Sequence, residues 1–138
     1  MSHFTTIQTQ IRDVAALEAA CTELGVELLH NAEARGYSGQ TRHGELVIRL
    51  KGPYDIAANR NPEGSDENSH QQNEKTNVAY ELATDWWDGH VEKEVGANYG
   101  RLLQFYGVHK TIGEASKRRL RVSRKQQHDG TIKLTLAA

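Results

Sequence analysis

Cysteine, proline and methionine are nearly absent from this chain, and it has no long apolar run. The 138 residues include one cysteine, two prolines and one methionine. A single Cys21 cannot close an intrachain disulfide, so nothing calls for an oxidising compartment. No run approaches the 18 apolar residues of a membrane-spanning helix, and the first residues lack the pattern of an export signal. We therefore expect a cytoplasmic protein that does not enter a membrane.

Hydrophobic residues are also scarce for a compact domain. They make up 37% of the chain, and the mean hydropathy is −0.70. A chain of this length can still bury about two-thirds of its unfolded surface in one domain. The sequence predicts a single domain over 1–138 with a polar, mobile insertion at about 52–77. That segment holds both prolines and many Asn, Gln, Ser, Asp and Glu residues, which cannot offset the entropy of ordering.

Apolar spacing and turn residues predict the order strand, helix, three strands, helix and two strands. The expected strands lie at 3–11, 26–30, 46–50, 78–82, 120–122 and 132–136, and the expected helices at 14–24 and 91–109. Asp13 can cap the first helix, and Gly25 suits the left-handed position after its last turn. The glycines of the second helix indicate a bend or close packing. Asp129-Gly130 predicts a hairpin turn.

This order predicts an α+β fold in which a mostly antiparallel sheet carries two helices on one face. A ferredoxin-like (split βαβ) arrangement with an added C-terminal hairpin would satisfy the order. A less regular α+β sheet would satisfy it as well, so the pattern leaves both arrangements open.

Charge is nearly balanced overall but reverses along the chain. The sequence has 17 Lys and Arg residues against 18 Asp and Glu residues. Residues 55–94 hold ten acids and three bases, whereas residues 101–125 hold eight bases and one acid. Opposed charged segments are typical of binding proteins, because a local field steers partners even when the net charge is small.

Residues 85–90, Asp-Trp-Trp-Asp-Gly-His, form the run that most resembles a site. Asp85, Asp88 and His90 could ligate a divalent metal ion, although such sites usually need three or four converging ligands. Trp86 and Trp87 could anchor a protein partner. A structural interpretation is stronger: at a strand end one tryptophan points into the core and the other away, and the next residues start a helix.

The densest positive charge lies at 117–125. Its candidate partner-binding residues are Arg118, Arg119, Arg121, Arg124 and Lys125. The four arginines, with Tyr106 as a stacking side chain, could instead bind nucleic acid. Alternation favours a third interpretation, in which Leu120 and Val122 face the core and the basic residues form a solvated strand edge. A pI near 6.7 is low for a dedicated nucleic-acid-binding domain.

The other reactive residue types show no catalytic spacing. Cys21 lies on the apolar face of the first expected helix, as an inert core residue does. Seven histidines are scattered without an HxxxH spacing, and no serine stands in a Gly-x-Ser-x-Gly elbow. We therefore expect neither catalytic residues nor a cofactor.

Three stretches of the chain are similar to a known family. They are MSHFTTI at 1–7, YELATDWW at 80–87 with the tyrosine-bearing helix that follows, and QHDGTIKLTL at 127–136. Together they resemble the hypothetical chloroplast reading frame thirty-five (ycf) family, a domain of unknown function of cyanobacteria, algal plastids and some other bacteria and phages. The similarity spans nearly the whole chain and is weak at 52–77.

The resemblance implies a cytoplasmic or stromal protein and assigns no reaction. Similar proteins are often encoded near an ATPase of the AAA class, which by association implies an accessory role. With the charge pattern, this favours a non-enzymatic accessory or adaptor protein that binds another protein, with an AAA ATPase as one candidate. A nucleic-acid-binding module using 117–125 and a small metal-assisted enzyme are the alternatives, and self-association stays open.

Overall fold

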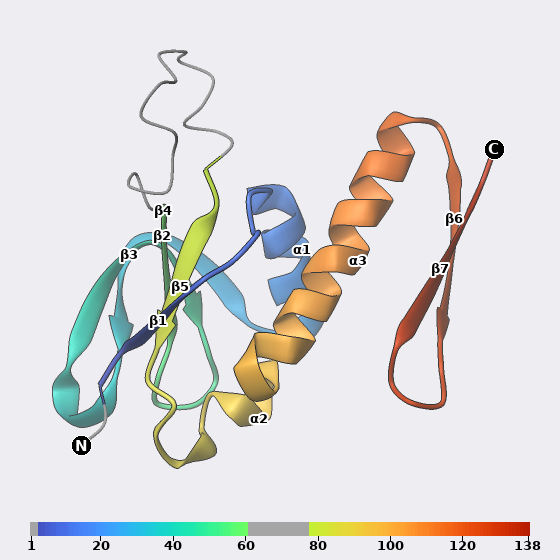
Figure 1. Cartoon of the computed structure of the whole chain (residues 1–138). Coiled ribbons are helices and arrows are strands. Elements are labelled where there is room, and N and C mark those ends of the chain that lie inside the picture. The colour runs from blue at the N-terminus through green and yellow to red at the C-terminus, as the bar shows by residue number, and fades with distance from the viewer. Residues whose placement is uncertain (1–2, 61–77) are drawn as a thin grey trace, which may run out of the picture.

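Residues 3–60 and 78–138, which the computed structural model describes, form a five-stranded sheet, a layer of helices and a separate hairpin (Figure 1). The strands are β1 (Thr5–Gln8), β2 (Glu27–Arg35), β3 (Thr41–Arg49), β4 (Ile56–Arg60), β5 (Tyr80–Thr84), β6 (Arg121–Gln126) and β7 (Ile132–Ala137). The helices are α1 (Val14–Leu24), α2 (Glu92–Val95) and α3 (Gly100–Lys117), with 3-10 turns at Tyr37–Gly39, Trp87–Gly89 and Ala97–Tyr99. None of the helices in these two ranges has the length and apolarity that a bilayer crossing requires.

The five-stranded sheet has the order β1-β5-β4-β3-β2, and each neighbouring pair is antiparallel. α1 connects the two edge strands and lies with α3 on one face of the sheet (Figure 1). The expected α+β fold is therefore confirmed. The strand order is not ferredoxin-like, because α3 leads out to the β6–β7 hairpin and not back into the sheet.

α1 has the caps that the sequence predicts. The Asp13 carboxylate accepts a hydrogen bond from the Ala16 N–H at 3.1 Å, and Gly25 has the left-handed φ of 79°. Leu17 and Cys21 are buried against the sheet, so the apolar face was also placed correctly. Both ends of this helix follow from local sequence alone.

The main core lies between the helices and the sheet. Leu17 of α1, Leu82 of β5 and Leu102 of α3 are among its fully buried members. Tyr106 of α3 is also buried, and its hydroxyl accepts hydrogen bonds from the Arg12 and Asp13 N–H groups at 3.0 and 3.1 Å. This side chain joins α3 to the start of α1.

The β2–β3 hairpin bends back over the sheet face that the helices leave free. Asn31 in β2 has a left-handed backbone, with a φ of 49°. A Cβ on Gly44 of β3 would lie 2.4 Å from the Leu46 carbonyl oxygen and 3.3 Å from the Ala57 Cα, so the close approach requires glycine. The bend encloses a second, smaller cluster of buried residues, namely Ala34, Val47 and Ala57.

β4 lies inside the segment that was expected to be a mobile insertion, so that expectation is wrong for residues 56–60. The Ile56-Ala57-Ala58 run is fully buried between β3 and β5. A strand buried on both faces shows no alternation, and a three-residue apolar run is too short to predict one. Residues 61–77 of the expected insertion lie outside the described residues.

Residues 91–109 do not form one continuous helix. Gly96, Asn98 and Tyr99 adopt positive φ values of 84°, 53° and 63°, and they separate α2 from α3. The bend that the glycines indicated is therefore present, and α3 continues to Lys117. The break turns Tyr99 into the core, where its ring packs edge-on against Trp86 at a centroid distance of 4.8 Å.

A Schellman motif ends α3 and directs the chain into the hairpin. The Leu120 N–H donates to the Ala115 carbonyl at 2.9 Å, and the Arg119 N–H donates to the Ser116 carbonyl at 3.1 Å. Arg119 therefore occupies the left-handed position, with a φ of 58°, where glycine is the usual residue.

Arg119→Gly is expected to raise the free energy of unfolding by about 0.5 to 1 kcal/mol, because glycine adopts this backbone conformation without steric strain. Arg118 precedes it with a φ of −92°, so Arg118→Gly should lower the stability. Urea titrations of the two variants and the wild type measure both effects. Destabilisation by Arg119→Gly would contradict the left-handed assignment.

Candidate interaction surface

The β6–β7 hairpin stands beside α3 as a sheet of its own (Figure 1). Within the described residues each strand pairs only with the other, so each has a free edge. Directly opposite residues of an antiparallel pair share a face. The inner face, turned toward α3, carries Val122, Arg124, Gln126, Ile132, Leu134 and Leu136. The outer face carries Arg121, Ser123, Lys125, Lys133, Thr135 and Ala137.

The inner face is incompletely covered by α3. Two open grooves lie between them, one lined by Gln104, Phe105 and Ile132, and the other by Ala115 and Leu136. Leu136 keeps 47% of its surface exposed. Because an isolated two-stranded hairpin is marginally stable in water, this one depends on tethers to the body or on a partner.

An ion pair tethers the hairpin to the body. Arg124 donates to Glu23 of α1 through Nη1 to Oε1 at 2.9 Å and through Nη2 to Oε2 at 2.6 Å. His109 Nε2 lies 2.8 Å from the same Oε1, and the Arg124 guanidinium lies 5.9 Å from the Phe105 ring centroid. The hydrogen bonds from Arg124, with a smaller contribution from His109, lower the pKa of Glu23 to about 2.

Glu23→Gln is expected to lower the free energy of unfolding by about 1 to 2 kcal/mol at pH 7, because it removes a charged acceptor from the tether. The lowered pKa means that the carboxylate stabilises the fold fully above pH 4.5 and loses this effect as pH falls toward 2. The stability difference between wild type and variant should therefore shrink below pH 4.5. Urea unfolding at a series of pH values measures it.

Glu18→Gln is the matched control for this prediction. Glu18 lies on the same helix and makes no ion pair in the parts of the chain that the structure describes. Its removal should change stability by less than about 0.5 kcal/mol. A Glu23→Gln effect that stays constant down to pH 2.5 would show that the carboxylate charge does not hold the hairpin.

The structure divides the basic residues that were expected to form a binding surface. All five are exposed. Arg124 differs from the other four because it lies on the inner face and is held by Glu23, so its charge is already compensated. Tyr106 is buried, so it is not available to stack on a base. Lys133 was not expected, and it lies on the outer face directly opposite Lys125.

The outer face of the hairpin is strongly basic. Residues 117–138 hold seven bases and one acid, whereas the remaining chain holds ten bases and seventeen acids. Among the described residues, no carboxylate lies within ion-pair distance of Arg121, Lys125 or Lys133. Directly opposed like charges, such as Lys125 and Lys133, destabilise a strand pair. The uncompensated positive charge makes the outer face of the hairpin a candidate binding surface.

The two tryptophans point in different directions, as the sequence predicts. Trp86 is partly buried and packs on Tyr99. Trp87 is 50% exposed, and its ring meets that of Tyr37 edge-on at a centroid distance of 5.7 Å. Trp87 therefore remains a candidate for partner contact, while Trp86 is mainly a packing residue.

Asp85, Asp88 and His90 do not converge. The buried Asp85 carboxylate accepts hydrogen bonds from the Tyr37 and Trp87 N–H groups at 3.1 and 3.0 Å. His90 Nε2 lies 3.7 Å from Asp88 Oδ2. In residues 3–60 and 78–138, no three His, Cys, Asp or Glu side chains come close enough to hold a metal ion. The metal-assisted alternative thus gains no support from the geometry.

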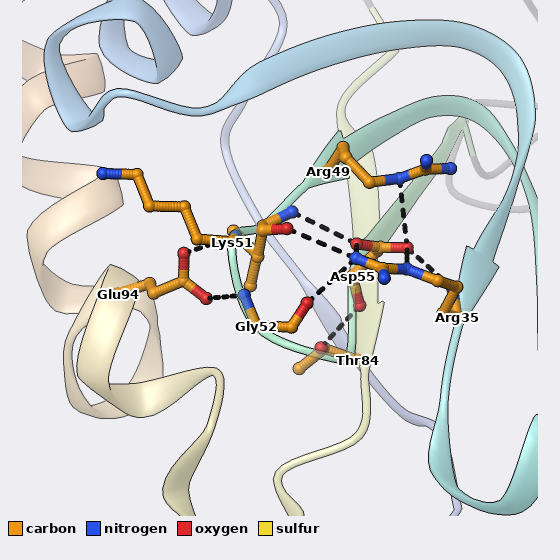
Figure 2. A network of polar contacts seen from close by, with 8 residues as sticks. Arg35, Arg49, Lys51, Gly52, Asp55, Thr84 and Glu94 are labelled. Atoms are coloured by element: carbon orange, nitrogen blue, oxygen red, sulfur yellow. Dashed lines mark hydrogen bonds and ion pairs between the residues drawn. The ribbon is translucent and has the colours of Figure 1, made fainter.

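A buried polar cluster centres on Asp55, just before β4 (Figure 2). Arg35 donates to Oδ2 from its backbone N–H and from Nε, at 2.9 and 2.8 Å, and to Oδ1 from Nη2 at 2.9 Å. The Leu50 N–H donates to Oδ1 at 3.1 Å, and Arg49 Nε lies 3.4 Å from Oδ2. The Thr84 hydroxyl donates to the Asp55 carbonyl at 2.8 Å.

This cluster has a structural role. Each Asp55 carboxylate oxygen accepts at least two hydrogen bonds, and the donors come from the folded-back end of β2 and from the end of β3. Asp55 thereby fastens the bent hairpin to the start of β4. Glu94 of α2 holds the connection between β3 and β4, because it accepts hydrogen bonds from the Lys51 and Gly52 N–H groups at 2.7 and 3.1 Å (Figure 2).

Comparison with known proteins identifies a family. A family model described as a protein of unknown function, DUF1257, matches residues 20–135. No curated protein and no solved structure matches the chain. The matched range runs from α1 to β7, so it includes the hairpin. The match confirms the expected domain of unknown function. It does not test the resemblance to the plastid reading-frame family. Because it covers well over half of the 138 residues, the chain belongs to the DUF1257 family.

Proposed function

We propose that this protein is a non-enzymatic accessory protein, or adaptor, that binds an acidic surface of another protein through its C-terminal hairpin. The observation that carries the proposal is the outer face, where Arg121, Lys125 and Lys133 have no carboxylate partner among the described residues. Electrostatic complementarity of this kind steers a partner and fixes its orientation.

The buried reactive groups support binding over catalysis. Asp55 and Asp85 accept hydrogen bonds from backbone or arginine donors that belong to the fold. Burial raises the pKa of the Cys21 thiol to about 12, so it is no nucleophile at neutral pH. The acidic and thiol groups of the interior thus have structural explanations.

Affinity capture with a charge-reversed hairpin tests the proposal. The variant carries Arg121→Glu, Lys125→Glu and Lys133→Glu, and a control carries Lys51→Glu, Lys93→Glu and Arg101→Glu on the body. Wild type and control should capture the same protein at low salt, and the amount captured should fall as salt rises. The hairpin variant should not capture this protein. An AAA ATPase is the first partner to test. Equal capture by the hairpin variant would overturn the proposal.

Nucleic acid is the second candidate partner, and the same outer cations favour it, because phosphates would compensate them. Filter binding to mixed RNA and DNA distinguishes the two. Retention by wild type that falls steeply with salt and is lost in the hairpin variant would favour nucleic acid over a protein. No retention even at low salt would exclude it.

A further inference from the structure

The two free edges of the hairpin differ in charge. β6 carries three cations among six residues, Arg121, Arg124 and Lys125, whereas β7 carries Lys133 alone. Charged side chains on an edge strand discourage pairing with another chain, and an apolar edge without them invites it. β7 is therefore the edge that is open to pairing.

The backbone of β7 presents its free hydrogen-bonding groups at the apolar positions. The Gln127 N–H donates to the Thr131 carbonyl at 2.7 Å, so these two residues form a hydrogen-bonded pair at the turn. Hydrogen-bonded and non-hydrogen-bonded pairs alternate along an antiparallel ladder. Counting from the turn, the N–H and C=O groups of Ile132, Leu134 and Leu136 point away from β6 toward the free edge.

One register of β7 against another β7 satisfies all of these groups. A two-fold axis through Leu134 places it opposite the partner's Leu134 and places Ile132 opposite the partner's Leu136. The three apolar pairs would exchange about six backbone hydrogen bonds. Lys133 then faces the partner's Thr135, so no two charges oppose each other directly. Apolar matching and charge compatibility thus select the same register.

We propose that a second copy of this chain pairs antiparallel with β7, giving a four-stranded sheet β6-β7-β7-β6. The two cationic β6 strands would lie at its outer edges, three strand spacings or about 14 Å apart. That separation exceeds the Debye length of about 8 Å at physiological salt, so their repulsion is screened. Four strands give the stability that two strands lack, and the dimer joins two basic outer faces into one surface.

This inference goes beyond the proposed function, because it concerns the β7 edge and not the outer face. Sedimentation and cysteine cross-linking test it on the full chain. Wild type should sediment as a dimer at about 100 µM. Leu134→Cys should form a dimer-linking disulfide on mild oxidation, since the paired Cα atoms would lie about 5.5 Å apart. Leu136→Cys should not, because its copies would lie about 14 Å apart.

Proline substitution separates loss of pairing from loss of folding. Leu134→Pro removes an N–H that points away from β6, so it should weaken the dimer at least about tenfold while the hairpin persists. Gln126→Pro is the matched control, because it removes an outward N–H from the β6 edge and should leave the dimer intact. Circular dichroism confirms the fold of both. A wild-type monomer at about 100 µM, or equal cross-linking at 134 and 136, would overturn the inference.

Discussion

Asp55→Ala is expected to lower the free energy of unfolding by about 3 kcal/mol, because it leaves the buried Leu50 N–H and three half-buried Arg35 donors without an acceptor. Asp55 is fully buried, and it accepts hydrogen bonds from Arg35 and from the Leu50 N–H. Removing one partner of such a network costs more than the network contributes as a whole. Urea unfolding followed by tryptophan fluorescence measures the loss.

A surface ion pair supplies the control for this prediction. Arg60 lies 2.9 Å from the Glu45 carboxylate, and both side chains are partly exposed. Glu45→Ala should therefore lower stability by less than about 1 kcal/mol. Equal losses in Asp55→Ala and Glu45→Ala would show that the Asp55 cluster does not hold the bent hairpin.

Gly44→Ala is expected to destabilise the protein by about 3 kcal/mol, near the upper end for overpacking in a core. The added Cβ would meet the Leu46 carbonyl oxygen at 2.4 Å and a Val47 methyl at 2.9 Å. The Leu46 carbonyl belongs to the β3 backbone, so it cannot move aside without shifting the strand. Thermal unfolding monitored by circular dichroism measures this effect.

Gly113→Ala is the same substitution, but it is expected to change stability in the opposite direction. Gly113 lies in α3, and a Cβ there would have no atom within 4 Å. Alanine should therefore stabilise the helix by up to about 1 kcal/mol. If Gly44→Ala behaved like Gly113→Ala, the close approach of Gly44 to the Leu46 carbonyl and the Val47 side chain would be refuted.

The features that the sequence predicted are those set by local residues. Asp13 and Gly25 cap the two ends of α1 through contacts with its own backbone, and Asp129-Gly130 marks the hairpin turn. The features that it missed depend on residues far apart in the chain. Asp55 accepts hydrogen bonds from Arg35 only because the β2–β3 hairpin folds back, and the local signals of that bend, Asn31 and Gly44, do not show which residues it brings together.

Part of the candidate surface could be predicted from the sequence. Alternation along the strand places Arg124 on the same, inner face as Val122. The sequence therefore indicated that Arg124 faces the body, where it pairs with Glu23, although the run of basic residues suggested a solvent-facing side chain. Lys133 could be assigned to the outer face only with the strand register across the turn. Tyr106 was misjudged because its hydroxyl is satisfied by backbone groups more than 90 residues away in the chain.

In the proposed function, the C-terminal hairpin is the part of this protein that contacts the partner. Amide hydrogen exchange of the chain, alone and with the captured protein, measures whether it does. In dilute, monomeric protein the hairpin amides should exchange much faster than those of β3, β4 and β5, because few contacts hold the hairpin to the body. With the partner bound, new protection should be confined to β6 and β7. Protection that appears instead around Trp87, or nowhere, would contradict the account.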